Sequence, residues 1–187
     1  MPRSYRPDHP APLAVMLHGA GGNAMGALGP WMALAEEAGV ILLAPESRGA
    51  TWDVILGRMG PDVAFLDRAL EYVFDRFMVD PARIVVEGFS DGASYALTVG
   101  LAHGALFRQI VAFSPGFSVP PRRVGSPRIF VTHGVRDPVL PIKACSRVIV
   151  PRLEGQGYEV RYVEFPDGHT VPRELAREAL EWALQRA

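Results

Sequence analysis

Six short runs of apolar and β-branched residues recur along the chain, and longer segments of mixed apolar and polar residues separate them. The runs are LAVML (13–17), VILLA (40–44), RIVVEG (83–88), QIVAF (109–113), RIFVT (128–132) and EVRYVEF (159–165). The first five are almost continuously hydrophobic, which is typical of strands that are covered on both faces. We therefore predict that these runs form a parallel sheet.

Two of the segments between the runs carry the pattern of amphipathic helices. In residues 62–77, Leu66 and Leu70 belong to an apolar stripe with acidic and basic residues opposite it, and residues 171–185 repeat this pattern. Strands that alternate with helices indicate an α/β fold, in which helices cover both faces of a mostly parallel sheet. Since 187 residues is an ordinary length for one domain, we expect a single domain over 1–187.

Charge and cysteine content exclude several classes of protein. Lysine and arginine total 19 against 20 aspartates and glutamates, so no basic field favours a nucleic acid partner. Cys145 is the only cysteine, which excludes an internal disulfide and a thiolate metal cluster. The five histidines are dispersed, so we predict neither a metal nor a cofactor. The polar, proline-rich start lacks the pattern of a signal peptide, and a cytoplasmic protein without a membrane partner is the simplest expectation.

The segment GFSDG places Ser90 between Gly88 and Gly92, directly after one predicted strand and before a helical pattern. Such a strand-to-helix turn exposes the serine hydroxyl at the carboxyl edge of the sheet. It also directs the N–H of Asp91 to the place where an oxyanion would develop. A tight turn without any catalytic role fits the motif equally well, so the hypothesis of a nucleophilic serine requires a base and an acid.

A histidine and an aspartate follow later strands at the same predicted edge. His169 lies in a glycine-containing loop between the last strand and the last helix, and we predict that it is the base. Asp137 follows the strand at 128–132 and is the predicted acid. Asp91 is expected to lie along the new helix, and Asp167, two residues from His169, is a second choice for orienting the imidazole.

The loop LHGAGGNA after the first strand supplies a further candidate donor. Its glycines allow backbone N–H groups to point inward, and Ala20 is placed to donate beside Asp91 in an oxyanion hole. A phosphate cradle is the alternative, but the loop lacks both the G-x-G-x-x-G spacing and the lysine of a P-loop. We interpret His18 and His133, each next to a glycine at a strand end, as residues that brace loops.

Two loops are candidate walls of a substrate pocket. The loop at 47–61 contains Trp52 and Leu56 without a helical or strand period, so these side chains either fill the core or line a pocket, and we favour the lining. Phe117, in the connection at 114–127, is a weaker candidate for the same role. That connection is too short and too rich in proline for a helical cap, which predicts an open site.

The motifs LHGAGG, GFSDG, HGVRDPVLP and DGHTVP, in this order, resemble the α/β-hydrolase superfamily. The resemblance is greatest to bacterial phospholipase/carboxylesterase-type serine esterases, which are related to acyl-protein thioesterases and dienelactone hydrolases. It implies Ser90 as nucleophile, Asp137 as acid, His169 as base, and the N–H groups of Ala20 and Asp91 as oxyanion donors. Members of this family usually begin with an antiparallel hairpin, but only about a dozen residues precede Leu13 here. We therefore expect a mostly parallel sheet of about six to seven strands with a reduced N-terminal hairpin, and no large cap.

The expected function is therefore hydrolysis of small carboxylic esters with short to medium acyl chains, through an acyl-enzyme on Ser90. A thioesterase or lactonase of the same fold, or a non-catalytic module that binds a ligand, are the alternatives. We expect a monomer or a homodimer. Asp91 is a departure from many relatives, because its carboxylate opposes a developing negative charge unless it turns away from the site.

Overall fold

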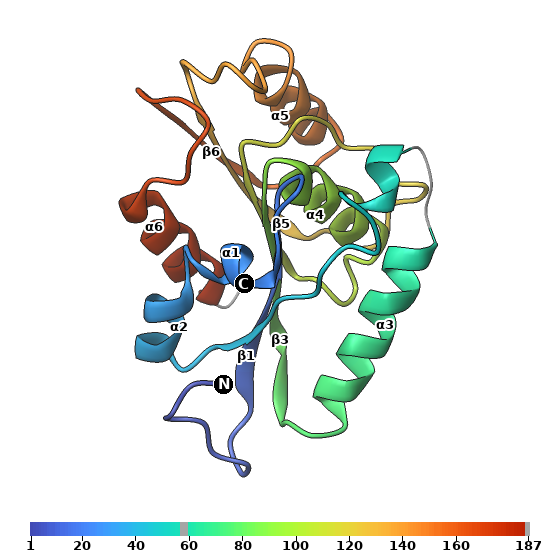
Figure 1. Cartoon of the computed structure of the whole chain (residues 1–187), viewed down its shortest axis with the longest axis vertical. Helices are drawn as coiled ribbons and strands as arrows, with labels where there is room; N and C mark the ends of the chain where they lie inside the picture. Colours follow the sequence, from blue (N-terminus) through green and yellow to red (C-terminus); the bar gives the residue numbers. More distant parts are fainter. Residues whose placement is uncertain (57–59, 186–187) are drawn as a thin grey trace.

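The computed structural model describes residues 1–56 and 60–185, and a parallel sheet runs through the centre of this part of the chain (Figure 1). The sheet has six strands in the order β2-β1-β3-β4-β5-β6, and every neighbouring pair is parallel. The strands are β1 (Ala11–Leu17), β2 (Ile41–Leu43), β3 (Val79–Phe89), β4 (Gln109–Phe113), β5 (Arg128–Gly134) and β6 (Val160–Phe165). All six predicted strands are confirmed. No strand precedes β1 in the described residues, so the N-terminal hairpin is absent there rather than merely reduced.

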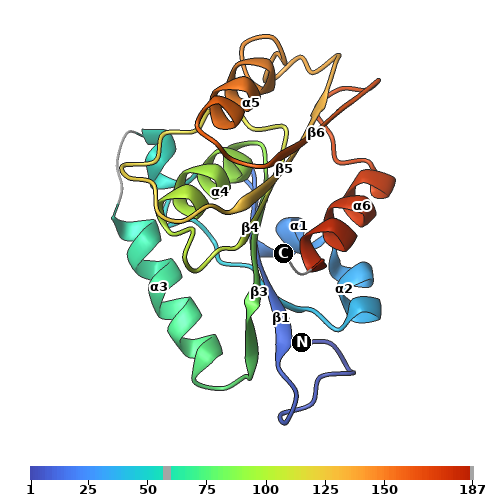
Figure 2. The same cartoon turned by 180° about the vertical axis from the view of Figure 1, so that it is seen from behind.

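Helices cover both faces of the sheet, as Figures 1 and 2 show. One face carries α1 (Ala24–Leu28), α2 (Met32–Ala38) and α6 (Arg173–Leu184). The other carries α3 (Pro61–Phe74), α4 (Asp91–Ala102) and α5 (Ser146–Gly155), together with the 3₁₀ turn η1 (Asp53–Leu56). None of the helices in the described ranges has the length and hydrophobicity that a bilayer crossing requires.

Each strand supplies side chains to two separate hydrophobic clusters, because successive residues of a strand point to opposite faces. In β3, Val86 belongs to the cluster under α3, α4 and α5, whereas Val85 belongs to the cluster under α1, α2 and α6. Both side chains are completely buried. This explains the nearly continuous hydrophobicity of the run, since a strand covered on both faces has no solvent side.

The parallel arrangement gathers several loops at one edge of the sheet. The segments that follow the carboxyl ends of β1, β3, β5 and β6 all lie there, although they are far apart in the sequence. The connection at 114–127 contains no helix, as its length and prolines predict. The edge therefore has no helical cap from this segment.

Candidate active site

Ser90 occupies a tight turn between β3 and α4. Its backbone has φ 59° and ψ −121°, a conformation that L-residues adopt only when the surrounding structure imposes it. A Cβ atom on Gly88 would lie 2.2 Å from the carbonyl oxygen of Gly92, and one on Gly92 would lie 2.1 Å from the carbonyl oxygen of Leu17. Both glycines are thus required by backbone packing, and this packing holds the strained serine in place.

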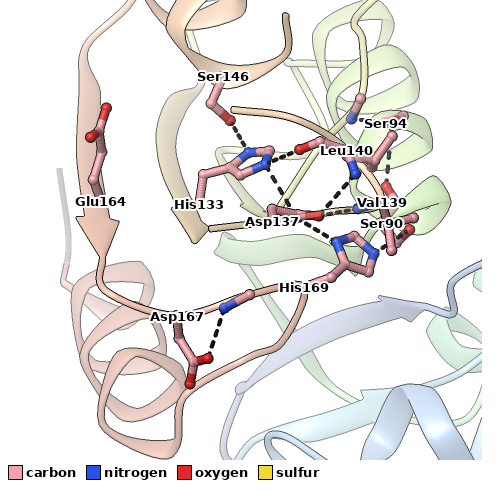
Figure 3. A network of polar contacts seen from close by, with 12 residues as sticks. Ser90, Ser94, His133, Asp137, Val139, Leu140, Ser146, Glu164, Asp167 and His169 are labelled. Carbon is pink, nitrogen blue, oxygen red and sulfur yellow. Dashed lines mark hydrogen bonds and ion pairs between the residues drawn. The ribbon is translucent and has the colours of Figure 1, made fainter. Parts of the chain in front are cut away.

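The structure brings Ser90, His169 and Asp137 into one chain of hydrogen bonds (Figure 3). The Nε2 atom of His169 lies 2.9 Å from the hydroxyl oxygen of Ser90, and its Nδ1 atom lies 2.6 Å from Oδ2 of Asp137. With Nδ1–H donating to the carboxylate, Nε2 is left free to accept the serine proton. This arrangement can turn a serine hydroxyl into a nucleophile.

Asp137 is held by more than its contact with His169. Its side chain is fully buried, and its Oδ1 atom accepts hydrogen bonds from the backbone N–H groups of Val139 at 2.8 Å and Leu140 at 2.9 Å. Burial acts to raise the pKa of Asp137, but the hydrogen bonds from Leu140, His169 and Val139 outweigh it and hold the pKa below its ordinary value. The carboxylate is therefore ionised and fixed in orientation.

A second histidine, His133, lies on the other side of the same carboxylate. It is completely buried, its Nε2–H donates to the carbonyl of Leu140 at 2.7 Å, and Nε2 is 3.3 Å from Oδ2 of Asp137. Its Nδ1 accepts from the hydroxyl of Ser146 at 2.7 Å. Burial lowers the pKa of His133, so the ring is neutral. It braces the loop that carries Asp137, and sequence reasoning missed its contact with Asp137 itself.

The two other aspartates near the motifs do not contact His169 in the structure. The carboxylate of Asp91 accepts a hydrogen bond from the hydroxyl of Thr51 at 2.7 Å. Asp167 is exposed, and its carboxylate accepts from the N–H of Gly168, on the far side of the loop from the imidazole (Figure 3). Asp137 alone among these three carboxylates is placed to orient His169.

The loop after β1 packs directly against the serine. A Cβ atom on Gly19 would lie 3.4 Å from Cβ of Ser90. The ring of His18 braces this loop, since its Nδ1–H donates to the carbonyl of Gly19 at 2.7 Å and its Nε2 accepts from the N–H of Ser47 at 3.0 Å. The carbonyl of Gly19 and the N–H of Ala20 belong to one planar trans peptide, so fixing the carbonyl fixes the opposite direction of the N–H.

The prediction that the side chain of Trp52 lines a substrate pocket is wrong. Trp52 is 1% exposed, its indole N–H donates to the carbonyl of His18 at 2.7 Å, and its ring stacks on Tyr95 of α4 with centroids 4.8 Å apart. The ring belongs to the core because a helix from elsewhere in the chain supplies a flat aromatic partner. The prediction for the side chain of Leu56 lies outside the described residues. Phe117 lines a different cavity, formed with α5, to which Ser90 and His169 do not contribute.

The structure instead contains a cavity of about 270 Å³ on the α1 side of the site, which sequence reasoning missed. Phe89 lines it, and the Phe89 ring lies 4.6 Å from the ring of His169. Glu87, a buried carboxyl side chain on β3, also lines it. The sequence feature that could have indicated this cavity is the single acidic residue in the run RIVVEG. A carboxyl group is rarely buried in a central strand unless it has a partner or a function.

Comparisons with known proteins identify esterases among the proteins that this chain is similar to. The family model described as phospholipase/carboxylesterase matches residues 63–181. Feruloyl esterase C of Emericella nidulans is 33% identical over 150 residues, which cover 76% of this chain and 54% of that protein. The probable feruloyl esterase C of Aspergillus niger is 30% identical over 174 residues, which cover 89% of this chain and 63% of that protein. The chain thus spans somewhat more than half the length of these relatives.

Solved structures share the fold. A thermostable esterase superposes with a TM-score of 0.84 at 25% identity, covering 100% of this chain and 57% of that one. Esterase PE8 superposes with a TM-score of 0.78 at 22% identity, covering 97% of this chain and 94% of that one, which supports the fold alone. From the family match and from a parallel sheet that carries a strained serine beside a histidine and an aspartate, we conclude that the chain belongs to the phospholipase/carboxylesterase family of α/β hydrolases.

Proposed function

We propose that this protein is a serine hydrolase that cleaves small carboxylic esters through an acyl-enzyme intermediate on Ser90. The observation that carries the proposal is the unbroken hydrogen-bond chain from the Ser90 hydroxyl through His169 to the buried Asp137 carboxylate. Ser90 is the nucleophile, His169 the general base and acid, and Asp137 the group that orients the imidazole and stabilises its charged form.

In the acylation step, the hydroxyl oxygen of Ser90 bonds to the ester carbonyl carbon while its proton passes to Nε2 of His169. Collapse of the tetrahedral intermediate breaks the bond to the alcohol oxygen, and the alcohol leaves with the proton from Nε2. Water then repeats the sequence: it gives a proton to Nε2, attacks the acyl carbon, and releases the carboxylic acid as Ser90 regains its proton. The two steps need no reactant other than the ester and water.

The backbone N–H groups of Ala20 and Asp91 are the proposed oxyanion donors. The Ala20 N–H makes no backbone hydrogen bond within the described residues, and its peptide is held by His18. The Asp91 N–H opens α4, where the first N–H groups of a helix have no acceptor within the helix. The hydrogen bond from Thr51 occupies the Asp91 carboxylate, which supports a role for its N–H without interference from its side chain.

Short to medium acyl chains are the proposed substrates. A long chain gains about 0.8 kcal/mol per methylene only where water is excluded, and the connection at 114–127 supplies no helix to enclose it. Rates on p-nitrophenyl esters from acetate to palmitate should level off early and show no jump when the substrate aggregates. A rate that climbs to the longest chains would contradict this preference.

The names of the relatives favour a second candidate substrate class. Since two similar proteins are named feruloyl esterase or probable feruloyl esterase, a methyl ester of ferulic acid belongs in the same panel, beside a thioester and a lactone. All of these acyl groups react through the same proposed machinery. The ratio of kcat/KM values across the panel ranks them.

Hydrolysis of p-nitrophenyl acetate by the Ser90→Ala variant tests the proposal against a non-catalytic binding module. We expect kcat to fall by about 10⁵- to 10⁶-fold, because the loss of the nucleophile removes the whole covalent route. Ser126→Ala, which alters an exposed serine outside the site, is the matched control and should retain full activity. Equal activity of Ser90→Ala and the parent protein would refute the proposed nucleophile.

A further inference from the structure

The cavity of about 270 Å³ beside the candidate active site has no role in the chemistry described above. Its lining includes residues of α1 and the residue Val171 just before α6, two helices that Figure 1 shows on the same face of the sheet. Its walls come from the loop after β1, from α1, from the end of β3 and from Val171 before α6. Two of its lining residues, Gly19 and Phe89, are direct neighbours of the site, through Cβ of Ser90 and the ring of His169. The cavity therefore adjoins the candidate active site through these two residues.

Among the polar residues that line this cavity, Glu87 carries the carboxyl group. The residue is only 2% exposed, and no residue in the described ranges forms a hydrogen bond or an ion pair with its side chain. Its partners across the sheet are Met16 and Val111, which are both completely buried apolar residues. Burying a carboxyl group without a partner costs free energy, so its presence calls for a ligand that completes its hydrogen bonds.

The surroundings of Glu87 decide which ligand groups fit. Burial raises the pKa of Glu87 well above its ordinary value, which favours the uncharged acid. An uncharged carboxyl group offers one donor and one carbonyl acceptor, which a hydroxyl group can match with its own donor and acceptor. The other titratable side chain in the lining is His18, whose two ring nitrogens already bond to the backbone. The cavity lining therefore supplies no charged side chain that would favour a charged ligand over an uncharged one.

We propose that this cavity is a subsite for an uncharged, hydroxyl-bearing part of the substrate, about the size of one ring, and that Glu87 binds its hydroxyl group. The size follows from comparison with an apolar cavity of about 150 Å³, which is sufficient to hold benzene. The link to an ester substrate rests on the proposed function, but the binding of the hydroxyl-bearing ring does not.

Binding of phenol to the Ser90→Ala protein, measured by ligand-detected NMR titration, tests the subsite without hydrolysis. Phenol should bind about five- to tenfold more tightly than anisole, in which a methyl group replaces the hydroxyl proton. In the Ser90→Ala background, Glu87→Leu should abolish the difference in affinity between phenol and anisole. Glu87→Gln in the same background should retain most of it. Glu154→Leu, which removes an exposed carboxylate on α5, is the matched control and should change nothing.

A second variant keeps the test valid if Glu87→Leu does not fold. Gly26 lines the cavity, and a Cβ atom there would meet only Asn23 Oδ1, at 3.6 Å, so Gly26→Leu adds an apolar side chain at the cavity wall without a backbone clash at Cβ. It should weaken phenol binding with Glu87 intact. Equal binding of phenol and anisole would overturn the proposal. Stronger binding of benzylamine that Glu87→Gln abolishes would also overturn it, in favour of a cation site.

Paired esters then show which side of the substrate enters the cavity. In the first pair the ring belongs to the alcohol: 2-(4-hydroxyphenyl)ethyl acetate and 2-phenylethyl acetate. In the second pair the ring belongs to the acyl group: ethyl 3-(4-hydroxyphenyl)propanoate and ethyl 3-phenylpropanoate. In one pair the hydroxyl should lower KM about five- to tenfold, and Glu87→Leu should remove that gain. If the hydroxyl changes KM in neither pair, the subsite is wrong. If no ester is hydrolysed while phenol still binds, the proposed function fails and the subsite stands.

Discussion

The Nδ1 atom of His169 lies 2.6 Å from Oδ2 of Asp137, although 32 residues separate the two in the sequence. Their loops follow β5 and β6, which are parallel neighbours, so both begin at the same edge of the sheet. The loops touch through backbone: a Cβ atom on Gly134 would lie 2.2 Å from the carbonyl oxygen of Gly168. The absence of a side chain at Gly134 therefore allows the loops that carry the histidine and the aspartate to come this close.

Replacing the carboxylate tests this relationship directly. Asp137→Asn keeps the shape of the side chain but removes the charge that selects the Nδ1–H tautomer, and we expect kcat to fall by about 10⁴-fold. Asp167→Asn is the matched control, because Asp167 is exposed and does not contact the imidazole. Steady-state kinetics on p-nitrophenyl acetate measures both. A larger loss in Asp167→Asn than in Asp137→Asn would reverse the assignment.

Gly134→Ala should lower activity through geometry alone. The added methyl group must push the loop at 167–169 away, and a displacement of about 1 Å in a reacting group can cost about 100-fold in rate. The same crowding should destabilise the fold by about 1–3 kcal/mol in urea unfolding. Gly155→Ala, at the end of α5 where no atom lies within 4 Å of the new Cβ, should leave kcat unchanged and should not lower stability. An unchanged kcat in Gly134→Ala would show that the loops are not held by this contact.

The buried carboxyl of Glu87 should make stability depend on pH. Its pKa is raised in the folded state, so above the ordinary glutamate pKa of about 4.3 the unfolded chain has released a proton that the folded chain still holds. The contribution of Glu87 to stability is therefore complete below that pH and is lost as the pH rises through its folded pKa.

Glu87→Gln removes this titration. The free energy of unfolding of Glu87→Gln minus that of the parent protein should increase with pH by up to about 1.4 kcal/mol per unit above pH 4.3, until Glu87 ionises in the folded state. Urea unfolding at pH 5 and pH 8 measures it, with Glu154→Gln as the surface control. A difference that stays constant with pH would mean that Glu87 is not a protonated buried acid.

Much of the fold and of the candidate site could be predicted because the decisive signals are local. The runs around Leu13, Val85 and Ile110 are continuously apolar since both faces of their strands are covered, and this pattern alone indicates a parallel sheet. Parallel strands bring their carboxyl ends to one edge, so Ser90 and His169 could be placed together from their positions after strands.

The parts that could not be predicted depend on partners from distant segments. Trp52 is a core residue because Tyr95 of α4 stacks on it and the carbonyl of His18 accepts its indole N–H, and nothing in the loop sequence around Trp52 indicates these partners. Likewise, the alternation of β3 places Glu87 on a buried face, but the empty volume next to it arises from how α1 and the glycine loop pack. The contact between His133 and Asp137 depends on the path of the loop after β5.

Mass spectrometry after reaction with a fluorophosphonate determines whether Ser90 is the nucleophile. Peptide mapping should find one phosphonylated residue, Ser90, in the parent protein and no adduct in Ser90→Ala. Asp137→Asn should react far more slowly, because the imidazole loses the carboxylate that orients it. An adduct that persists in Ser90→Ala, or one that maps to any other residue of the parent protein, would mean that Ser90 is not the nucleophile.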